Sequence, residues 1–376
     1  MKPPPSCLSG VATLAGGHDG AGRARNDGMQ RPASAHSHNL DVLRALAVCF
    51  VVASHVLIEH TLTRLGVYHV QSLGTLGVLI FFVHTCLVLM QSLERQHGAS
   101  GRKSMALSFF VMRVFRIYPM SIVVVLIVSF VERLSSSGEP TLLTLVSNVL
   151  LVQNMTGAPS VTPVLWSLPY EVQMYLFLPG LFVLSQVAGR YAWCWIVALW
   201  LSAVVLVLLV WRTGLNYDLI KFFPCFLPGV LAYSLRNTSR RCSAATLFIL
   251  VWSGVLAFPL LVGIGMSATV LSWFFCLALG SLLPRCRELR WPLLHRVGAT
   301  LARYSYGIYL VHVPVLHFAF QYCEGVSRIV SWILFVFGVI ALSYLAYHWI
   351  EKPGIAYGRA LARRFESGWA RTTRRA

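Results

Sequence analysis

The feature that most constrains this chain is the recurrence of apolar segments long enough to cross a bilayer. The sequence is 57% hydrophobic and only 12% charged, with a mean hydropathy of +0.68. These segments are rich in Leu, Val, Ile and Phe and lack the weak alternation of a membrane β-barrel. The sequence therefore predicts an all-α, polytopic membrane protein with about ten transmembrane helices. The predicted spans are 39–60, 72–92, 117–131, 166–187, 191–211, 218–235, 245–263, 268–283, 304–322 and 327–350.

The distribution of basic residues predicts the orientation of these spans. The apolar run 142–153 is too short to cross, and we expect it to be a re-entrant or interfacial segment. If the N terminus is cytoplasmic, nearly all Lys and Arg residues outside the spans fall on the inner side. The exceptions on the outer side are Arg64, Arg133, Arg212 and Arg328. Positive charge in short loops marks the cytoplasmic face, so both termini are expected in the cytoplasm.

One membrane domain accounts for most of the chain. Residues 1–38 are rich in Gly, Ala, Ser and Pro, which predicts a disordered cytoplasmic N-terminal segment in which translation starts at Met1 or Met29. Residues 39–353 form the predicted transmembrane domain. Residues 354–376 form a basic cytoplasmic tail that is expected to lie on the anionic inner leaflet.

The formal charge of +18 would suggest a nucleic-acid partner in a soluble protein. Here the charge lies in short loops and sets the membrane orientation, so no nucleic acid is expected as a partner. The nine cysteines form no CxxC pair, and several lie within predicted spans. Neither a disulfide framework nor a metal site is therefore expected.

The first predicted span, LDVLRALAVCFVVASHV, carries both Arg44 and His55. On a helix they lie about three turns and about 16 Å apart on nearly the same face. Arg44 is then near the cytoplasmic boundary and His55 in the outer half. Ionisable residues within a span usually face the bundle or a cavity and serve a function. The alternative is that Arg44 reaches back to lipid phosphates while His55 is a hydrogen-bonded packing residue.

Three further groups extend this pattern. Glu171 is expected at a depth similar to His55, where a carboxylate would fix the imidazole tautomer and raise its basicity. Glu59, one turn beyond His55, is an alternative partner, and Glu171 would otherwise serve only to hold helices together. Arg113 and Arg116 share a helix face at the inner end of the third span. They either clamp phosphates or are ordinary positive-inside anchors.

Six segments of the chain resemble, in the same order, the signature motifs of one known family. LDVLRALAVCFVVASH resembles LDGLRGLAxxxVxxxH, GVLIFFVHTCLVL resembles GVxxFFVxSGFL, and RVFRIYP resembles RxxRIxP. WSLPYEVQMY resembles WSLxxExxxY, YSYGIYLVHVPV resembles SYxxYLxHxP, and WIEKP resembles the closing IExP. By these motifs the sequence resembles, and is identified as a member of, acyltransferase family 3, the bacterial integral-membrane O-acyltransferases of surface polysaccharides, and residues 39–353 are then the acyltransferase domain. It resembles the stand-alone form, without the C-terminal esterase-like domain of some members.

The resemblance implies a donor and an acceptor. The donor would be a cytoplasmic acyl-CoA, most simply acetyl-CoA, and the acceptor a hydroxyl of an extracytoplasmic glycan or lipid-linked saccharide. The expected catalytic residues are His55, Glu171 and Arg44, with His55 as general base or transient acyl carrier and Glu171 orienting it. Arg113 and Arg116, with Arg44 nearby, would hold the CoA phosphates at the inner mouth while the pantetheine arm reaches toward His55.

Further candidates for substrate binding are Trp166, Tyr170, Tyr175, His312 and His84. Trp166 and Tyr170 lie near the outer interface, where they either form an aromatic belt or stack on a sugar. His312 either hydrogen-bonds in the same cavity or packs between helices. His84 and Thr85 replace the Ser and Gly usual in the family, and this difference bears on acceptor identity and pocket shape.

These expectations describe a multi-pass enzyme of the bacterial cytoplasmic (inner) membrane, in contact with membrane lipids. Two other classes remain open. A transporter or flippase of a polysaccharide precursor or small metabolite would use Arg44, His55 and Glu171 as an intramembrane relay, although the inverted repeats typical of such proteins are not evident. A structural subunit of a polysaccharide assembly complex would tolerate the loss of His55.

Overall fold

The computed structural model describes residues 37–60, 62–134, 140–215, 218, 220–322 and 326–373. These residues belong to one compact unit, His36–Ala376. The predicted disordered segment 1–38 lies outside the described residues except for its last two positions, and so does the alternative start at Met29. The final three residues of the predicted basic tail also lie outside them.

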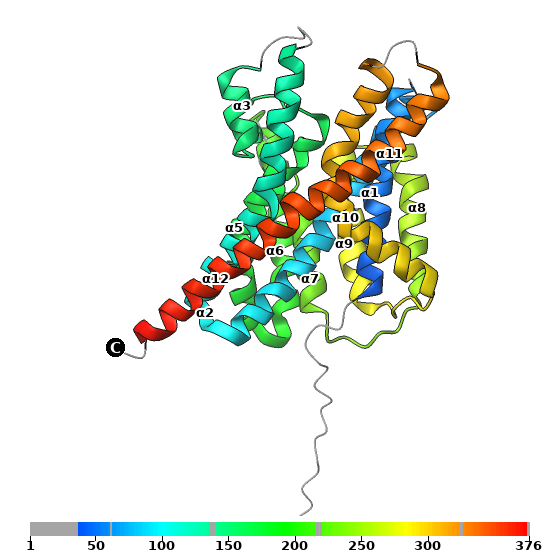
Figure 1. The fold of residues 1–376 in the computed structure, drawn as a ribbon. Helices are drawn as coiled ribbons and strands as arrows, with labels where there is room; N and C mark the ends of the chain where they lie inside the picture. Colours follow the sequence, from blue (N-terminus) through cyan, green and yellow to red (C-terminus); the bar gives the residue numbers. More distant parts are fainter. Residues whose placement is uncertain are drawn as a thin grey trace, which may run out of the picture. The chain divides into compact units, whose positions relative to one another are not determined.

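The described residues are almost entirely helical (Figure 1). The α-helices are α1 (His38–Glu59), α2 (Gln71–Leu134), α3 (Leu142–Val149), α4 (Gln153–Thr156), α5 (Leu168–Ala188), α6 (Ala192–Arg212), α7 (Phe223–Ser234), α8 (Ala244–Gly263), α9 (Ala268–Leu282), α10 (Pro292–His317), α11 (Arg328–Ala346) and α12 (Lys352–Thr373). The shorter helical segments are η1 (Pro163–Ser167), η2 (Gly189–Tyr191), η3 (Leu283–Arg285), η4 (Phe318–Tyr322) and η5 (Tyr347–Glu351). Within the described part, the only strands are β1 (Arg64–Leu65) and β2 (Tyr68–His69), a short antiparallel hairpin.

Seven helical stretches of the described part are long and apolar enough to cross a membrane. They are His38–Glu59, Gln71–Gly98, Met105–Leu134, Pro163–Arg212, Ala244–Gly263, Ala268–Arg285 and Arg328–Phe365. The predicted class, an all-α polytopic membrane protein, is confirmed. Each of the ten predicted spans overlaps a helix. The stretch Pro163–Arg212 contains two of them, α7 has only 12 residues, and α10 carries several polar residues in its first half.

The predicted inner loop 93–116 is helical, which corrects the sequence-based expectation. Helical residues of α2 continue through it, and Figure 1 shows that the element bends and turns back between the apolar stretches that end at Gly98 and begin at Met105. Charged residues such as Glu94 and Arg95 have high helix propensity, so polarity alone does not end a helix. Hydropathy therefore located the two spans correctly but could not show that helix joins them.

The short run predicted to be re-entrant or interfacial forms α3 and α4. α3 has only eight residues, and the side chain of Thr141 caps its start by accepting from the backbone N–H of Thr144. α3 buries its polar side chains, including Asn148, which donates to the carbonyls of Thr144 and Pro159. It exposes Leu142 instead, at 77% of its surface. An apolar outward face suits contact with lipid.

α1, which carries Arg44 and His55, packs against α2 and α10. Its side chains Leu43, Ala47 and Val51 are at most 1% exposed. The contact with α2 is close because Gly77 has no side chain: a Cβ there would lie 2.5 Å from the carbonyl oxygen of Ala47. Close backbone approach and burial fix the rotation of α1, and thereby the direction in which its two ionisable residues point.

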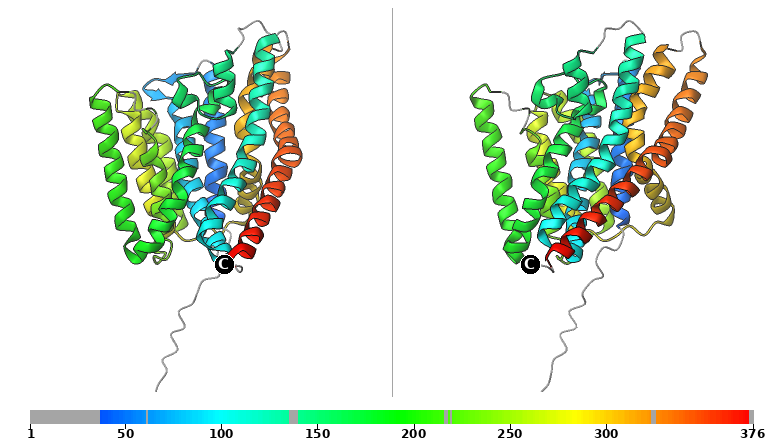
Figure 2. Two further views of the ribbon diagram at one scale, coloured as in Figure 1. Left: turned by 90° about the vertical axis from the view of Figure 1, so that its left-hand side faces the viewer. Right: turned by 60° about the vertical axis from the view of Figure 1, so that its left-hand side comes forward.

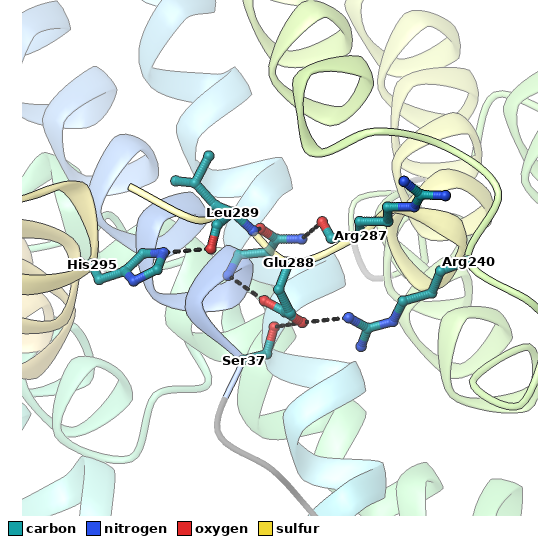
Figure 3. Close-up of polar contacts among 7 residues, drawn as sticks. Ser37, Arg240, Arg287, Glu288, Leu289 and His295 are labelled. Carbon is teal, nitrogen blue, oxygen red and sulfur yellow. Dashed lines mark hydrogen bonds and ion pairs between the residues drawn. The ribbon is translucent and has the colours of Figure 1, made fainter. Parts of the chain in front are cut away.

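The first turn of α1 is fastened to the segment between α9 and α10 (Figure 3). The Glu288 carboxylate accepts from the hydroxyl of Ser37, the backbone N–H of Asn39 and the guanidinium of Arg240, at 3.0, 3.1 and 3.1 Å. The Asn39 side chain donates to the carbonyl of Arg287 at 2.9 Å and accepts from the N–H of Leu289 at 2.9 Å. A carboxylate at a helix N-terminus satisfies donors that have no partner within the helix.

At the other end of the sequence, α11, η5 and α12 follow one another as one long helical element (Figure 2). α12 packs along α2, where a Cβ on Gly354 would lie 2.8 Å from the carbonyl oxygen of Phe115 and the rings of Phe115 and Tyr357 are 5.0 Å apart. The predicted boundary at 353/354 between membrane domain and tail falls inside α12. This packing brings the end of η5 next to the arginine-bearing part of α2.

Candidate active site

Two neighbouring cavities lie along α1. The first, called the outer cavity from the predicted orientation of α1, has a volume of about 580 Å³ and is lined by Ser54, His55 and Glu59 of α1. The second, called the inner cavity, has a volume of about 90 Å³ and is lined by Arg44 of α1, with Arg113 and other residues described below. The two residues predicted to share one face of α1 therefore face two different cavities.

His55 has a defined hydrogen-bonding environment. Its Nδ1 lies 2.9 Å from the carbonyl oxygen of Val51, and because a carbonyl only accepts, Nδ1 carries the proton in this contact. In the neutral imidazole the lone pair is then on Nε2, the arrangement that a general base needs. Nδ1 also lies 3.4 Å from Nε2 of His312, whose own Nδ1 is 3.0 Å from the carbonyl of Ile308.

Glu59 shares the outer cavity with His55. Its carboxylate accepts from the amide of Gln321 at 3.0 and 3.2 Å and lies 4.0 Å from Nε2 of His317. His317 and the half-buried Trp166 also line this cavity. A carboxylate, imidazoles and an indole around one space form a polar wall with an aromatic platform.

The inner cavity brings together three guanidiniums from two helices. Arg44 of α1 lines it with Arg113 and Arg116 of α2, and the Nε of Arg44 donates to the hydroxyl of Ser305 at 2.6 Å. Arg113 lies over the ring of Phe109, 5.9 Å from its centroid. The structure thus brings the three predicted arginines to the border of one space, and their shared role remains a prediction.

Glu171 also lines the inner cavity, which differs from the predicted pairing with His55. Its carboxylate accepts from the hydroxyl of Tyr175 at 2.5 Å, and the cations that act on it are Arg44, Arg113 and Arg116. The equal depth of Glu171 and His55 was inferred from residue counts. Depth does not specify which way a side chain points, and α5 turns Glu171 toward the arginines.

Glu351 is a site residue that the sequence analysis did not single out. It lies at the end of η5, is 1% exposed, and pairs with Arg116, with 2.6 Å between Oε2 and Nη1. The motif WIEKP was recognised only as part of the resemblance. The signal available was a lone carboxylate at the end of the apolar run ALSYLAYHWIE, since a charge in such a position needs a partner.

The remaining predicted substrate residues divide between the two cavities. Trp166 lines the outer cavity, and Tyr175 and His84 line the inner one. The Nδ1 of His84 is buried without a hydrogen-bond partner among the described residues. Tyr170 lines neither cavity, since its ring packs on Phe222, 5.0 Å between centroids. His312, 0% exposed, lies against His55 rather than on a cavity surface.

A metal site needs several His, Cys, Asp or Glu side chains close together. Within the ranges that the structure describes, no group of three or more His, Cys, Asp or Glu side chains is placed to hold one.

The fold defines the class of protein: a polytopic helical membrane protein, with two cavities between its helices that Arg, His and Glu side chains line. Residues 37–348 match the family model of acyltransferase family 3, which is described as an acyltransferase domain. The match covers most of the chain, and the protein belongs to this family of membrane acyltransferases. No curated protein and no solved structure matches the chain.

Proposed function

We propose that this protein is an O-acyltransferase of the bacterial inner membrane. It moves an acyl group, most simply acetyl, from cytoplasmic acyl-CoA to a hydroxyl of an extracytoplasmic glycan or lipid-linked saccharide. The observation that carries this proposal is the placement of three arginines and a base-competent histidine in two adjacent cavities along α1.

The inner cavity suits the phosphate end of the donor. Among the described residues, Glu171 is the one carboxylate that lines this cavity with Arg44, Arg113 and Arg116, and Glu351 pairs with Arg116, so three guanidiniums against two carboxylates leave a positive charge. Guanidiniums bind phosphate oxygens through several N–H donors at once. The charged part of CoA would stay at this end, because its phosphates are unfavourable in hydrocarbon.

The outer cavity suits the acceptor. A volume of about 580 Å³ holds a saccharide unit, and binding sites for small molecules commonly have 300–1,000 Å³. Glu59, His69 and Gln71 offer hydrogen-bonding groups for hydroxyls, and the Trp166 indole offers an apolar face for a sugar ring.

In the proposed reaction, Nε2 of His55 takes the proton of the acceptor hydroxyl as its oxygen attacks the thioester carbonyl carbon. A C–O bond forms and the C–S bond breaks. The proton then passes from the imidazolium to the departing thiolate, so that CoA leaves as a thiol. The Val51 carbonyl stabilises the imidazolium through its hydrogen bond with Nδ1.

The transporter alternative is less well supported by the contacts of these residues. A relay would need Arg44, His55 and Glu171 to exchange protons or charge in sequence. His55 instead contacts Val51 and His312, and Glu171 contacts Tyr175 in the other cavity.

The function is tested by comparing the surface glycans of cells with and without the gene. We expect O-acyl signals in the NMR spectrum to disappear when the gene is deleted and to return with the wild-type gene but not with His55→Ala. Membranes from the same cells, supplied with acetyl-CoA, should release CoA in proportion to the acceptor present. Unchanged glycans together with no acceptor-dependent CoA release would exclude the proposed reaction.

A further inference from the structure

The two cavities share two lining residues, Val78 of α2 and Tyr309 of α10. Every other lining residue belongs to one cavity alone. Both shared residues are buried, Val78 at 3% and Tyr309 at 6% exposure. The wall between the arginine-lined space and the space that contains His55 is therefore made in part by these two side chains.

Tyr309 is held in this wall by its hydroxyl. The hydroxyl donates to the carbonyl oxygen of Val164 at 2.7 Å and lies 2.7 Å from the hydroxyl of Ser167, which can then donate to it. Both partners belong to η1, the turn that also gives Trp166 to the outer cavity and Ser167 to the inner one. One tyrosine thus joins α10 to the turn that borders both spaces.

The ring of Tyr309 has two neighbours: one residue that lines the inner cavity, and the histidine that lies against His55. Phe81, which lines the inner cavity, meets it edge-on with centroids 6.0 Å apart. His312, the neighbour of His55, lies 6.3 Å from it between centroids. A donor whose phosphates stay among the arginines must bring its thioester past this ring to reach the base.

We propose that Val78 and Tyr309 form a partition through which the acyl end of the donor passes, and that this partition limits the size of the acyl group transferred. This inference rests on the proposed function. The partition is made of side chains, so rotation of Tyr309 away from η1 opens it without moving a helix. An apolar valine and an aromatic ring suit the passage of an uncharged acyl group, and longer acyl chains need more room between them.

The partition is tested in membranes that contain the full-length protein and its native acceptor. Membranes are supplied with an equimolar mixture of acetyl-CoA and butyryl-CoA, and alkali-labile acetate and butyrate are measured in the glycan and lipid fractions. A pocket discriminates by about 10-fold or more for each methylene. We therefore expect the wild type to prefer acetyl, and Val78→Ala to raise the butyryl-to-acetyl ratio by about 10-fold.

Two further variants keep the test decisive. Val78→Ile narrows the partition and should lower the butyryl-to-acetyl ratio. Tyr309→Phe keeps the ring but loses both hydrogen bonds to η1, and it should raise this ratio. Val313→Ala is the matched control, because Val313 is 2% exposed and lines only the outer cavity, and it should leave the ratio unchanged. The amount of folded protein is measured in parallel by size-exclusion chromatography of detergent extracts.

The outcomes separate the two proposals. A butyryl-to-acetyl ratio that stays constant in both Val78 variants while acetyl transfer continues would overturn the partition and leave the acyltransferase reaction standing. A ratio that shifts equally in Val313→Ala would also overturn it, because the effect would then belong to the outer cavity. Wild-type membranes that transfer neither acyl group would contradict the proposed function itself.

Discussion

The two cavities along α1 differ in how their polar groups are satisfied. In the inner cavity several charged groups bind one another or neighbouring hydroxyls, Arg116 with Glu351, Arg44 with Ser305 and Glu171 with Tyr175, whereas the Nε of Arg113 has no hydrogen-bond partner among the described residues. In the much larger outer cavity, Glu59 contacts a glutamine amide and a histidine at 4.0 Å. This contrast supports our proposal that the inner cavity holds a constant group and the larger outer cavity a variable one.

A donor with invariant phosphates and an acceptor with a variable structure would need this asymmetry. The inner group of arginines and carboxylates must remain fixed for each turnover, since mobile buried charges would be costly. The outer space needs room and only a few directional contacts. Four changes to the molecule test how far this comparison holds.

The largest effect, on the rate of acyl transfer, is expected from replacing His55, the proposed base in the outer cavity. His55→Gln keeps a side chain of similar size but cannot accept and return a proton, so acyl transfer should fall by about 10²- to 10⁴-fold. The measurement is acceptor-dependent CoA release by membranes. His348→Gln is the control, because His348 lines neither cavity and its ring lies against Tyr344, 4.3 Å between centroids. Equal losses in both variants would argue against a specific base.

The second effect is expected in the inner cavity and concerns stability. Glu351→Gln leaves the buried end of Arg116 without its carboxylate, and breaking such a pair typically destabilises by about 3–5 kcal/mol. The thermal midpoint of the purified protein should fall. In contrast, the double change Arg116→Met with Glu351→Leu should recover much of that stability while donor use stays impaired. Full activity in the double variant would show that Arg116 serves the fold alone.

A third test distinguishes binding of the donor phosphates by Arg113 from an effect of Arg113 on the shape of the inner cavity. Arg113→Gln should raise the KM for acetyl-CoA by about 10-fold, the loss of one charge-assisted contact, with a smaller effect on kcat. Acetyl-pantetheine lacks the nucleotide phosphates, so its KM should hardly change in the same variant. If both substrates are affected alike, Arg113 acts on the shape of the inner cavity rather than on phosphate.

The smallest effect is expected at the anchor of α1, far from either cavity. Glu288→Gln loses the charge that serves Arg240 and the first turn of α1 at a partly exposed place, so stability should fall by about 1 kcal/mol or less. The butyryl-to-acetyl ratio should remain that of the wild type. A large loss of transfer with unchanged stability would mean that the anchor also sets the position of His55.

Several parts of this molecule followed from the sequence alone. The positions of the spans could be predicted because hydropathy is a local property and each span must be apolar by itself. Arg44 and His55 could be placed along one helix because the helical repeat is fixed, and the arginines of α2 could be paired for the same reason. The family resemblance, carried by six motifs in order, was confirmed by the match over residues 37–348.

Contacts between helices were decided only by the tertiary structure. Glu171 of α5 lines a cavity with the arginines of α1 and α2 rather than with His55, Glu351 pairs with Arg116 from far along the sequence, and Tyr309 lies between the two cavities. The physical reason is that hydropathy fixes the depth of a residue but not the rotation of its helix or its neighbours. Those depend on close packing, such as that of Gly77 against Ala47, which no single segment encodes.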